Sequence, residues 1–238
     1  MAIRGILFDK DGTLLDFNAT WSPVIQQAAM AIAGHDPALA RVLLAEGGFD
    51  PESQTTAPDS LLTAANTVEI AEAWAELLQR PDRAFMVEEL DRIFQEGGVL
   101  NAVPVTELGP LFHALKGRGL ALGLATSDSE VAAESTLRRF ELMPHVDFVA
   151  GYDSGHGYKP EPGMFLAFYA ACGLPPSEVA MVGDNSHDLK MGKAAGAGAL
   201  IGVLTGSGTE AQLRLLTEHI LGSIVELEAW LDAREAAA

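Results

Sequence analysis

The chain has 238 residues and a single cysteine, Cys172. One cysteine excludes a disulfide within the chain, so the fold must depend on a packed core, and it fits a reducing compartment such as the cytoplasm. No apolar run approaches the ~18 residues that a membrane-spanning helix requires. The run that follows Met1 is too short for a secretory signal and is typical of a strand. We therefore expect a cytoplasmic protein without a membrane partner.

Basic residues are also scarce, with 15 Lys and Arg against 33 Asp and Glu, which gives a formal net charge of −18 at pH 7. This balance argues against nucleic acid or an anionic membrane as a partner. It also disfavours an anionic substrate at long range, so an anion site would need local help from a cation, a lysine and backbone amides. The composition is compatible with a monomer or a homodimer.

The chain is rich in short apolar runs without alternation, and hydrophobic residues make up 48% of it, which is ample for a packed core. Five runs are typical of strands covered on both faces: 3–8, 120–125, 147–150, 179–182 and 199–203. Helical patterns lie between or after them at 108–116, 130–140, 162–172, 186–195 and 223–231. This alternation predicts an α/β fold whose core is a doubly wound, Rossmann-like parallel sheet.

Residues 17–98 break this pattern, because they show almost no strand signal and contain much Ala, Leu and Glu. Helices are expected at 22–33, 37–46, 68–79 and 83–96. The stretch 47–58, with its Gly and Pro residues, is expected to be a loop. The segment therefore predicts an inserted, all-helical cap domain, and residues 1–16 and 99–238 form the α/β core. An insertion at the carboxyl end of a strand lies over the site of such a sheet, where it can act as a lid.

The first candidate site residues are Asp9 and Asp11, which follow directly after the first strand-like run. In an extended chain residues i and i+2 point the same way, so both carboxylates can face one substrate while Lys10 turns aside. One carboxylate can attack phosphorus, and the other can protonate the leaving oxygen and later activate water. Two acids this close need a cation, or one of them must hold a proton. A turn built on Asp11 and Gly12 is the alternative interpretation.

A second acidic cluster, with Asp184 and Asp188, follows the strand-like run at 179–182. Hard carboxylate oxygens suit Mg²⁺, which keeps several waters and also binds phosphate oxygens. Alternatively, Asn185 or Ser186 caps a helix and Asp188 offsets its dipole, but this explains Asp184 poorly. Because parallel strands end at one edge of a sheet, we expect the two acidic clusters to form one site.

Three further residues could bind an anion. Thr126 follows the run at 120–125, where a hydroxyl and a helix amino terminus together form an anion site. Ser127 comes next, and its spacing to Glu130 predicts a capping box, so Ser127 is a candidate both for anion binding and for capping the next helix. Lys159 lies in a loop rich in Gly and Pro and could neutralise a phosphate as a point charge.

Residues of the cap would select the substrate. Phe49, beside Gly47 and Gly48, lies in a loop that could be mobile and is a candidate for substrate binding. Trp21 could also line the cleft, although packing in the core of the first cap helix is the favoured interpretation. Asp50 could bond a hydroxyl or an amine, which would disfavour a carboxylate at that place.

In their order along the chain, these elements closely resemble the haloacid-dehalogenase-like (HAD) phosphohydrolase superfamily, and in particular its phosphoglycolate-phosphatase type. The most specific motif is Asp9-Lys10-Asp11-Gly12-Thr13-Leu14. The strand that ends in Thr126, the Lys159-Pro160 loop and the second acidic cluster follow in the expected sequence, and the insertion is similar to the family's helical cap. The resemblance covers nearly the whole chain, although Ser127 stands where many relatives have asparagine.

The resemblance implies a role for each residue. Asp9 is expected to be the nucleophile that forms an aspartyl phosphate, and Asp11 the general acid and base. Thr126 and Lys159 would bind the transferring phosphoryl group. The expected ligands of a magnesium cofactor are Asp9, Asp11 (through its main-chain carbonyl), Asp184 and Asp188 (directly or through water).

The implied activity is that of a magnesium-dependent phosphatase, a hydrolase whose partner is a small phosphorylated metabolite. Phosphoglycolate is the default substrate, and sugar phosphates and nucleotide monophosphates are alternatives. A phosphomutase on the same scaffold is a second class, which would need cap residues that hold a second phosphate. The basic residues of the cap are only Arg41, Arg80, Arg83 and Arg92. A non-catalytic binding protein is a third class, which the intact acidic motifs disfavour, and Asp11 argues against a dehalogenase.

Overall fold

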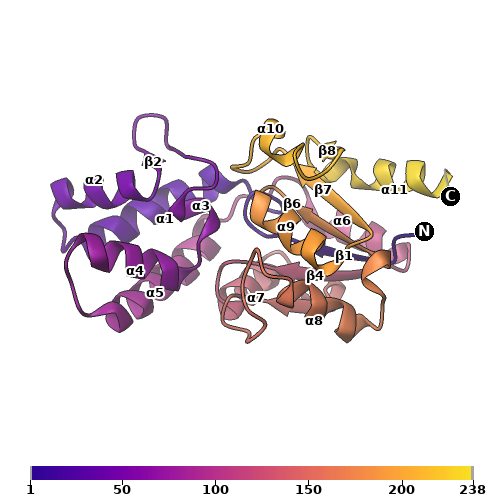
Figure 1. Ribbon diagram of the computed structural model, residues 1–238, viewed down its shortest axis with the longest axis horizontal. Coiled ribbons are helices and arrows are strands. Elements are labelled where there is room, and N and C mark those ends of the chain that lie inside the picture. Colours follow the sequence, from indigo (N-terminus) through magenta and orange to yellow (C-terminus); the bar gives the residue numbers. More distant parts are fainter. Residues whose placement is uncertain (1, 237–238) are drawn as a thin grey trace.

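The computed structural model describes residues 2–236, and its central feature is a six-stranded parallel sheet (Figure 1). The strands are β1 (Gly5–Phe8), β4 (Ala121–Ala125), β5 (Phe148–Ala150), β6 (Val179–Gly183), β7 (Ala199–Val203) and β8 (His219–Leu221). Their order across the sheet is β5-β4-β1-β6-β7-β8, so the chain builds outward from β1 in both directions. The predicted α/β class with a doubly wound, Rossmann-like parallel sheet is therefore confirmed.

Helices cover both faces of this sheet. They are α6 (Leu108–Gly117), α7 (Glu130–Arg139), α8 (Gly163–Cys172), α9 (Ser186–Ala195), α10 (Glu210–Leu213) and α11 (Leu227–Ala236), with the short 3-10 turns η1 (Met143–His145), η2 (Pro176–Glu178) and η3 (Ile224–Glu226). Successive residues of β1 face opposite sides of the sheet. Phe8 stacks on Phe112 of α6 with 5.4 Å between ring centroids, whereas Leu7 belongs to the apolar cluster that contains Phe168 of α8. All of β1 is buried, so packing on both faces fixes the position of the residues that follow its end.

The predicted elements of the core are present, with small shifts at their ends. β1 begins at Gly5 rather than at Ile3, and the tail predicted as one helix is η3 followed by α11. The sequence does not predict α10 or β8. β8 is a three-residue edge strand that pairs with β7 in the described sheet, so tertiary pairing rather than an apolar run defines it.

The segment that interrupts the core folds as a separate cap, at the left of Figure 1. Its elements are α1 (Phe17–Ile32), α2 (Pro37–Glu46), β2 (Phe49–Asp50), β3 (Thr55–Thr56), α3 (Leu61–Ala64), α4 (Thr67–Leu77) and α5 (Arg83–Asn101). The cap has its own apolar cluster, which includes the fully buried Trp74 and residues of α1, α2, α4 and α5. The insertion is therefore stabilised by a second hydrophobic core.

The cap departs from the prediction in several details, among them the start of α1 at Phe17 and the short helix α3. The expected loop at 47–58 contains an antiparallel hairpin of β2 and β3, so the cap is helical except at this hairpin. Strands of two residues are fixed by turn geometry, which leaves no strand-like run in the sequence. In addition, α5 continues to Asn101, beyond the predicted limit of the cap at residue 98. The predicted core range also includes residue 1 and residues 237–238, which lie outside the described residues.

Polar contacts join the cap to the core, among them those of Asp59 and Tyr152. Asp59, in the loop before α3, accepts hydrogen bonds from Ser186 of α9 at 3.0 Å and from Gln212 of α10 at 2.9 Å. Tyr152, in the loop after β5, donates to Asp91 of α5 at 2.7 Å. These contacts help to hold the cap over the carboxyl edge of the sheet.

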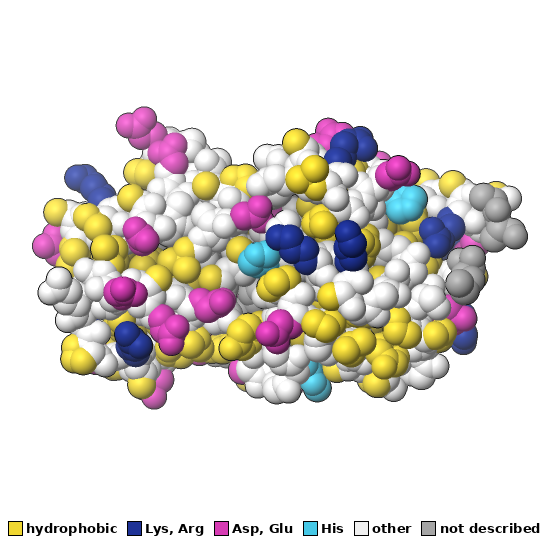
Figure 2. Space-filling model, in the orientation of Figure 1, with side chains coloured by type: hydrophobic (Ala, Val, Ile, Leu, Met, Phe, Trp, Pro, Cys, Tyr) yellow, Lys and Arg dark blue, Asp and Glu magenta, His cyan; other side chains and the backbone are white. Residues whose placement is uncertain are grey.

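The acidic side chains are spread over the surface of both domains. Figure 2 shows them on the cap and on the core of one face, without a single large patch. Charge that is spread in this way is typical of a solvated surface. Among residues 2–236, no helix is both long enough and apolar enough to cross a membrane.

Candidate active site

The two acidic clusters meet at the carboxyl edge of the sheet. β1 lies directly beside β6, with Phe8 opposite Val182 in parallel register, so Asp9 and Asp184 follow adjacent strand ends. The main-chain N–H of Asp9 donates to the carbonyl of Val182 at 2.9 Å, which extends the strand pairing into the site. Two distant parts of the sequence thus form one site, as expected.

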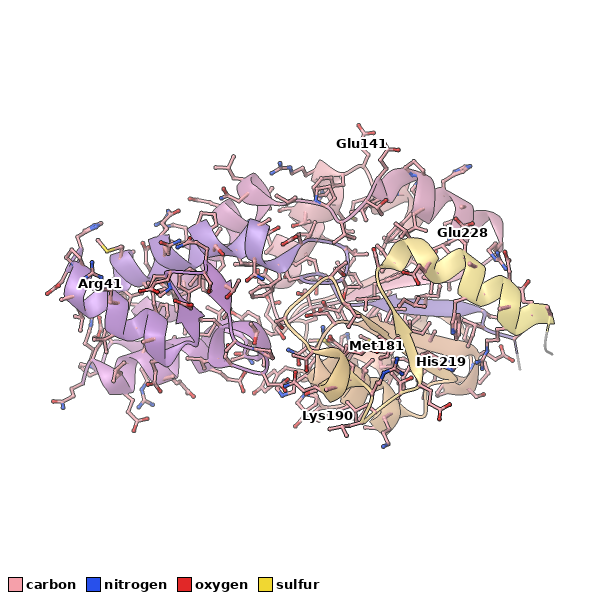
Figure 3. All side chains as sticks on the ribbon, turned by 90° about the horizontal axis from the view of Figure 1, so that it is seen from above. Arg41, Glu141, Met181, Lys190, His219 and Glu228 are labelled. Carbon is pink, nitrogen blue, oxygen red and sulfur yellow. The ribbon has the colours of Figure 1, made fainter. Side chains whose placement is uncertain are left out.

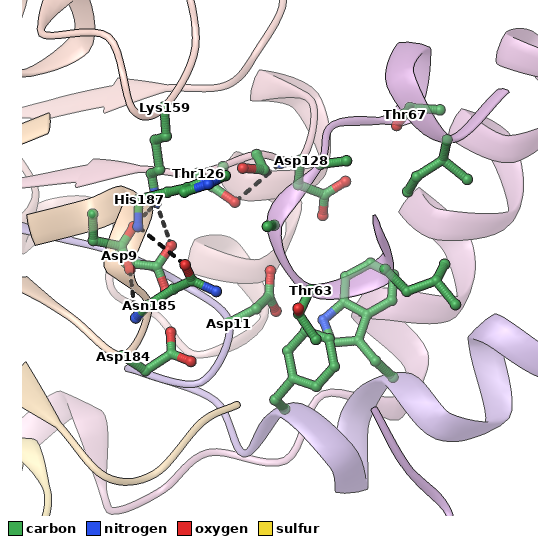
Figure 4. Close-up of a pocket in the computed structure, with 18 of the residues that line it drawn as sticks. Asp9, Asp11, Thr63, Thr67, Thr126, Asp128, Lys159, Asp184, Asn185 and His187 are labelled. Atoms are coloured by element: carbon green, nitrogen blue, oxygen red, sulfur yellow. Dashed lines mark hydrogen bonds and ion pairs between the residues drawn. The ribbon is translucent and has the colours of Figure 1, made fainter. Parts of the chain in front are cut away.

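A cavity between the core and the cap contains the predicted core residues (Figure 4). Its core side includes Asp9, Asp11, Thr126, Ser127, Lys159, Asp184 and Asp188. Further core residues on the same wall are Asp128, Asn185 and His187. Residues of α1, α3, α4 and α5 close the cavity from the cap side.

Asp9 is buried, and its two oxygens have different surroundings. Oδ1 lies 2.5 Å from the Nζ of Lys159, whereas Oδ2 has no hydrogen-bond partner within residues 2–236. Burial raises the pKa of Asp9 to about 7; the Lys159 ammonium opposes this shift, and the Asp188 and Asp11 carboxylates add to it. A buried carboxylate oxygen without a partner is suited to bind a cation or to attack an electrophile.

Asp11 has the same arrangement with a second lysine. Its Oδ2 lies 2.9 Å from the Nζ of Lys10, while Oδ1 is buried and, in the described part of the chain, unpartnered. Lys10 is 1% exposed, is absent from the cavity wall and also contacts Asp128 at 2.9 Å. Burial alone would lower the pKa of the Lys10 ammonium, but Asp11 and Asp128 raise it above its usual value. Lys10 therefore stays charged and fixes the orientation of Asp11.

Asp128 is a site residue that the sequence analysis missed. Burial raises the pKa of this carboxyl group, and the neighbouring Lys10 opposes that shift. Its Oδ2 accepts a hydrogen bond from Lys10, and its Oδ1 accepts one from the N–H of Ser129 at 3.2 Å. Its spacing of two residues from Thr126, just beyond a strand end, is the same signal that identifies Asp9 and Asp11.

Three carboxylates form a candidate metal centre. One oxygen each of Asp9, Asp184 and Asp188 lies within 4.8 Å of the other two, and all three residues are buried. Burial, followed by the charges of Asp9 and Asp188, raises the pKa of Asp184 well above its usual value. Lys159 contacts two of these carboxylates, which leaves negative charge in excess. Hard oxygen ligands and uncompensated negative charge fit a divalent cation such as Mg²⁺.

Asp184 is held between two loops that approach closely. Gly12 has a φ of +87°, and a Cβ at this position would lie 2.5 Å from the Cγ of Asp184, so glycine is needed here. From the other side, the N–H of Ser207 donates to Oδ2 of Asp184 at 2.8 Å. Thr205, in the same loop after β7, donates to the carbonyl of Gly12 at 2.7 Å. Neither Thr205 nor Ser207 belongs to a recognisable motif, so sequence reasoning did not find them.

Thr126 and Lys159 have groups available for an anion. The Oγ1 of Thr126 accepts a hydrogen bond from the N–H of Asp128 at 3.1 Å, so the hydroxyl hydrogen can be donated to a ligand. Burial would lower the pKa of Lys159, but Asp188 and Asp9 raise it above its usual value. A charged lysine and a hydroxyl donor therefore face the same cavity as the reactive oxygens.

The predicted capping box at Ser127 is wrong. Ser129 is the cap of α7, because its side chain accepts a hydrogen bond from the N–H of Ala132 at 3.3 Å. The chain continues two residues beyond Ser127 before it turns into the helix, which sequence spacing alone did not distinguish. Ser127 lies on the cavity wall instead, where its hydroxyl can contribute to anion binding.

The cap side of the cavity also differs from the prediction. Phe49 is buried at 3% exposure in the apolar cluster of the cap, so its predicted contact with substrate is wrong. Strand β2 directs this side chain into the cap, a direction that a loop-like sequence does not reveal. Asp50 is exposed and accepts a hydrogen bond from Ser53 within the hairpin. Trp21 has both of its predicted roles, since it lines the cavity and packs edge-on against Phe94 at 5.4 Å.

Known sequences resemble this chain over most of its length. A family model for haloacid dehalogenase-like hydrolases matches residues 3–196. The phosphoglycolate phosphatase of Salmonella typhimurium is 24% identical over 198 residues, which cover 82% of this chain and 79% of the relative. A protein named "Probable phosphatase IndB", from Dickeya dadantii, is 38% identical over 107 residues, and this match spans 45% of this chain and 46% of the relative.

Solved structures share the architecture. A structure described as a haloacid dehalogenase-like hydrolase from Bacteroides fragilis superimposes with a TM-score of 0.72 and 20% identity, over 94% of this chain and 99% of that one. A structure described as a β-phosphoglucomutase from Thermotoga maritima gives a TM-score of 0.64 and 21% identity, over 99% and 100% of the two chains. At these identities the likeness shows the fold alone.

Magnesium should stabilise the protein, because it would relieve repulsion among the buried carboxylates. We expect saturating Mg²⁺ to raise the melting temperature by roughly 5–10 °C and EDTA to reverse this rise, measured by differential scanning fluorimetry. Asp184→Asn should lose most of the shift, whereas the exposed control Asp232→Asn should keep it. A shift of full size in Asp184→Asn would contradict the metal centre.

Loss of Lys10 should destabilise the fold, because it leaves Asp11 and Asp128 without their counterion. We expect Lys10→Met to lower the free energy of unfolding in urea by about 3–5 kcal/mol. The exposed Lys193 of α9 provides a matched control, and Lys193→Met should change stability little. Equal effects of the two substitutions would show that the buried ion pairs contribute no more than a surface lysine.

Proposed function

The chain belongs to the haloacid dehalogenase-like hydrolase family, and we propose that it is a magnesium-dependent phosphatase that hydrolyses a small phosphomonoester through an aspartyl phosphate. The observation that carries this proposal is that Asp9 and Asp11 are held in the same way. In each carboxylate a lysine holds one oxygen, and the other oxygen is buried and, within residues 2–236, unpartnered. One acid is thereby available as a nucleophile and the other as a proton donor.

In the first step, Oδ2 of Asp9 attacks phosphorus and the bond from phosphorus to the alcohol oxygen breaks. Asp11, as the general acid, gives a proton to the departing alcohol oxygen. Lys159 and the hydroxyl of Thr126 contact the phosphoryl oxygens and stabilise the charge that develops on them. The products of this step are the free alcohol and a phosphorylated Asp9.

In the second step, the carboxylate of Asp11 takes a proton from a water molecule, whose oxygen attacks phosphorus. The bond between phosphorus and Asp9 breaks, which releases inorganic phosphate and restores the carboxylate. Magnesium, held by Asp9, Asp184, Asp188 and the main-chain carbonyl of Asp11, would supply positive charge that neutralises the phosphoryl oxygens and the acidic cluster. The same residues therefore serve both steps without rearrangement of the core.

The relatives suggest the first substrates to test. The match to a phosphoglycolate phosphatase makes phosphoglycolate the default compound, with sugar phosphates and nucleotide monophosphates as further candidates. The scarcity of cysteine fits a reducing compartment and supports a cytoplasmic location for such an enzyme.

A phosphomutase is the second candidate, because the structure described as a β-phosphoglucomutase shares the fold. A mutase needs cationic groups in the cap to hold a second phosphate. Among the described residues that line the cavity from the cap, none is Lys or Arg. Arg80 pairs with Asp82, Arg92 pairs with Glu89 and Glu96, and Arg41 lies at the far end of the cap in Figure 3. These positions favour the phosphatase.

Asp9→Asn should abolish turnover while the fold stays intact, because an amide cannot form the aspartyl phosphate. Phosphate release from a broad panel of phosphorylated metabolites with Mg²⁺ should fall at least about a thousandfold relative to the natural chain. Circular dichroism provides the control for folding. Activity close to that of the natural chain would refute the assignment of the nucleophile.

Asp11→Asn should slow both steps, because the amide can neither give a proton to the leaving alcohol nor take one from water. We expect each step to slow by about 10²–10⁴-fold in rapid-quench experiments that follow the phosphorylated protein. Titration of Mg²⁺ in the same variant separates the roles. If the substitution raised only the magnesium requirement, Asp11 would be a metal ligand without an acid–base role.

A further inference from the structure

The cap wall of the cavity is apolar. Six of the side chains that it contributes are large and buried: Phe17, Trp21, Ile25, Leu62, Ile70 and Phe94. The remaining cap residues on this wall are small or carry hydroxyl groups: Thr63, Ala64, Ala65 and Thr67. In the described structure the cap therefore offers no charged side chain to the part of a substrate that extends away from the phosphate.

The charged groups of the cavity lie on the core wall, and the lysine among them is paired there. Lys159 contacts Asp9 and Asp188, so its ammonium is already shared between two carboxylates. Lys10 lies behind the wall, 5.4 Å from the centre of the Trp21 ring, but Asp11 and Asp128 neutralise it. A carboxylate or a second phosphate under the cap would meet apolar side chains and five acidic residues, which is costly for a buried anion.

The cap wall offers few polar groups to a substrate. Trp21 is 6% exposed, and its Nε1–H is a buried donor that has no partner among residues 2–236. The hydroxyl of Thr63, by contrast, is bonded within the cap to the carbonyls of Ala57 and Ser60. A buried indole N–H in a ligand cavity is satisfied when the ligand brings a hydrogen-bond acceptor.

We propose that the substrate is the phosphate ester of an uncharged alcohol. The alcohol has an apolar body and a group that accepts a hydrogen bond from the Nε1–H of Trp21. This inference rests on the phosphatase function proposed above and goes beyond it, because it excludes hydroxy acids such as glycolate and bisphosphates as preferred substrates. The cap selects the alcohol by apolar contact and by the absence of a cation, and the core wall binds the phosphoryl group that all candidates share.

Three esters of nearly equal shape test the proposal: phosphoglycolate, its primary amide and isobutyl phosphate. They differ in charge and in the presence of an acceptor but not in the number of heavy atoms. With Mg²⁺ and the unmodified chain, kcat/KM should be at least about tenfold higher for the amide and for isobutyl phosphate than for phosphoglycolate. An equal or higher value for phosphoglycolate would overturn the proposal and leave the phosphatase function standing.

Two substitutions sharpen this test. Ala64 is half-buried at the end of α3, so Ala64→Arg can bring a guanidinium to the cap wall without burying it completely. Ala64→Arg should raise kcat/KM for phosphoglycolate, relative to that for the amide, by about tenfold. Ala38→Arg adds the same charge at an exposed position of α2 and should leave this ratio unchanged. An identical ratio in Ala64→Arg, Ala38→Arg and the natural chain would count against selection by charge.

Trp21→Phe removes the indole N–H but keeps an aromatic ring. It should lower kcat/KM for the amide by about fivefold more than for isobutyl phosphate, because the isobutyl group has no hydrogen-bond acceptor. Equal losses for the two esters would overturn the role of Nε1, and the melting temperature of the variant reports any general loss of packing.

A separate measurement distinguishes failure of this inference from failure of the phosphatase proposal. If no ester in a broad panel releases phosphate, the phosphatase proposal is wrong. The three matched esters are then titrated calorimetrically into Asp9→Asn with Mg²⁺. Tighter binding of the amide than of phosphoglycolate, by about tenfold, would support the preference of the cavity for an uncharged group, and equal or weaker binding would overturn it.

Discussion

Two buried lysines control the acidic edge of this sheet. Lys159 holds one oxygen of Asp9, and Lys10 holds one oxygen of Asp11 while it also neutralises Asp128. Without these contacts, desolvation and mutual repulsion of the carboxylates would oppose folding of the strand ends. Because each lysine occupies only one oxygen of its partner, the other oxygen is left for chemistry. The interactions that make the fold possible are therefore also the ones that orient the candidate catalytic groups.

The two domains contribute different kinds of side chain to the site. The core contributes the acidic residues, Lys159 and the candidate metal centre, which lie on loops that follow strands or, for Asp188, in the first turn of α9. The cap contributes apolar side chains from helices that have their own hydrophobic core. Contacts such as those of Asp59 with Ser186 and Gln212 keep the two walls together. In the proposed function, phosphoryl transfer and selection of the alcohol therefore depend on different parts of the chain, and a change in the cap wall is expected to alter the selection without altering the transfer.

Much of this arrangement could be predicted, and the failures have specific causes. Apolar runs without alternation identify most of the strands of the buried sheet, and the acidic residues that follow them identify Asp9 and Asp184. The predictions failed for Phe49 and Ser127, where the direction of a side chain or the first residue of a helix depends on backbone geometry. Asp128 was missed although its spacing from Thr126 is a local signal, and its contact with Lys10, 118 residues away in the sequence, forms only in the folded chain. Such pairings appear only when packing brings the segments together.

Most strands and helices of the core, the place of the insertion and the acidic motifs can be read from the sequence alone. These features are local, since each depends on composition and spacing within one short segment. The folded chain, as described for residues 2–236, is needed to show which oxygen of Asp9 and of Asp11 lacks a partner and which side chains of the cap face the cavity. Those features depend on contacts between residues far apart in the sequence and on the packing of two separate hydrophobic cores, which local spacing does not encode.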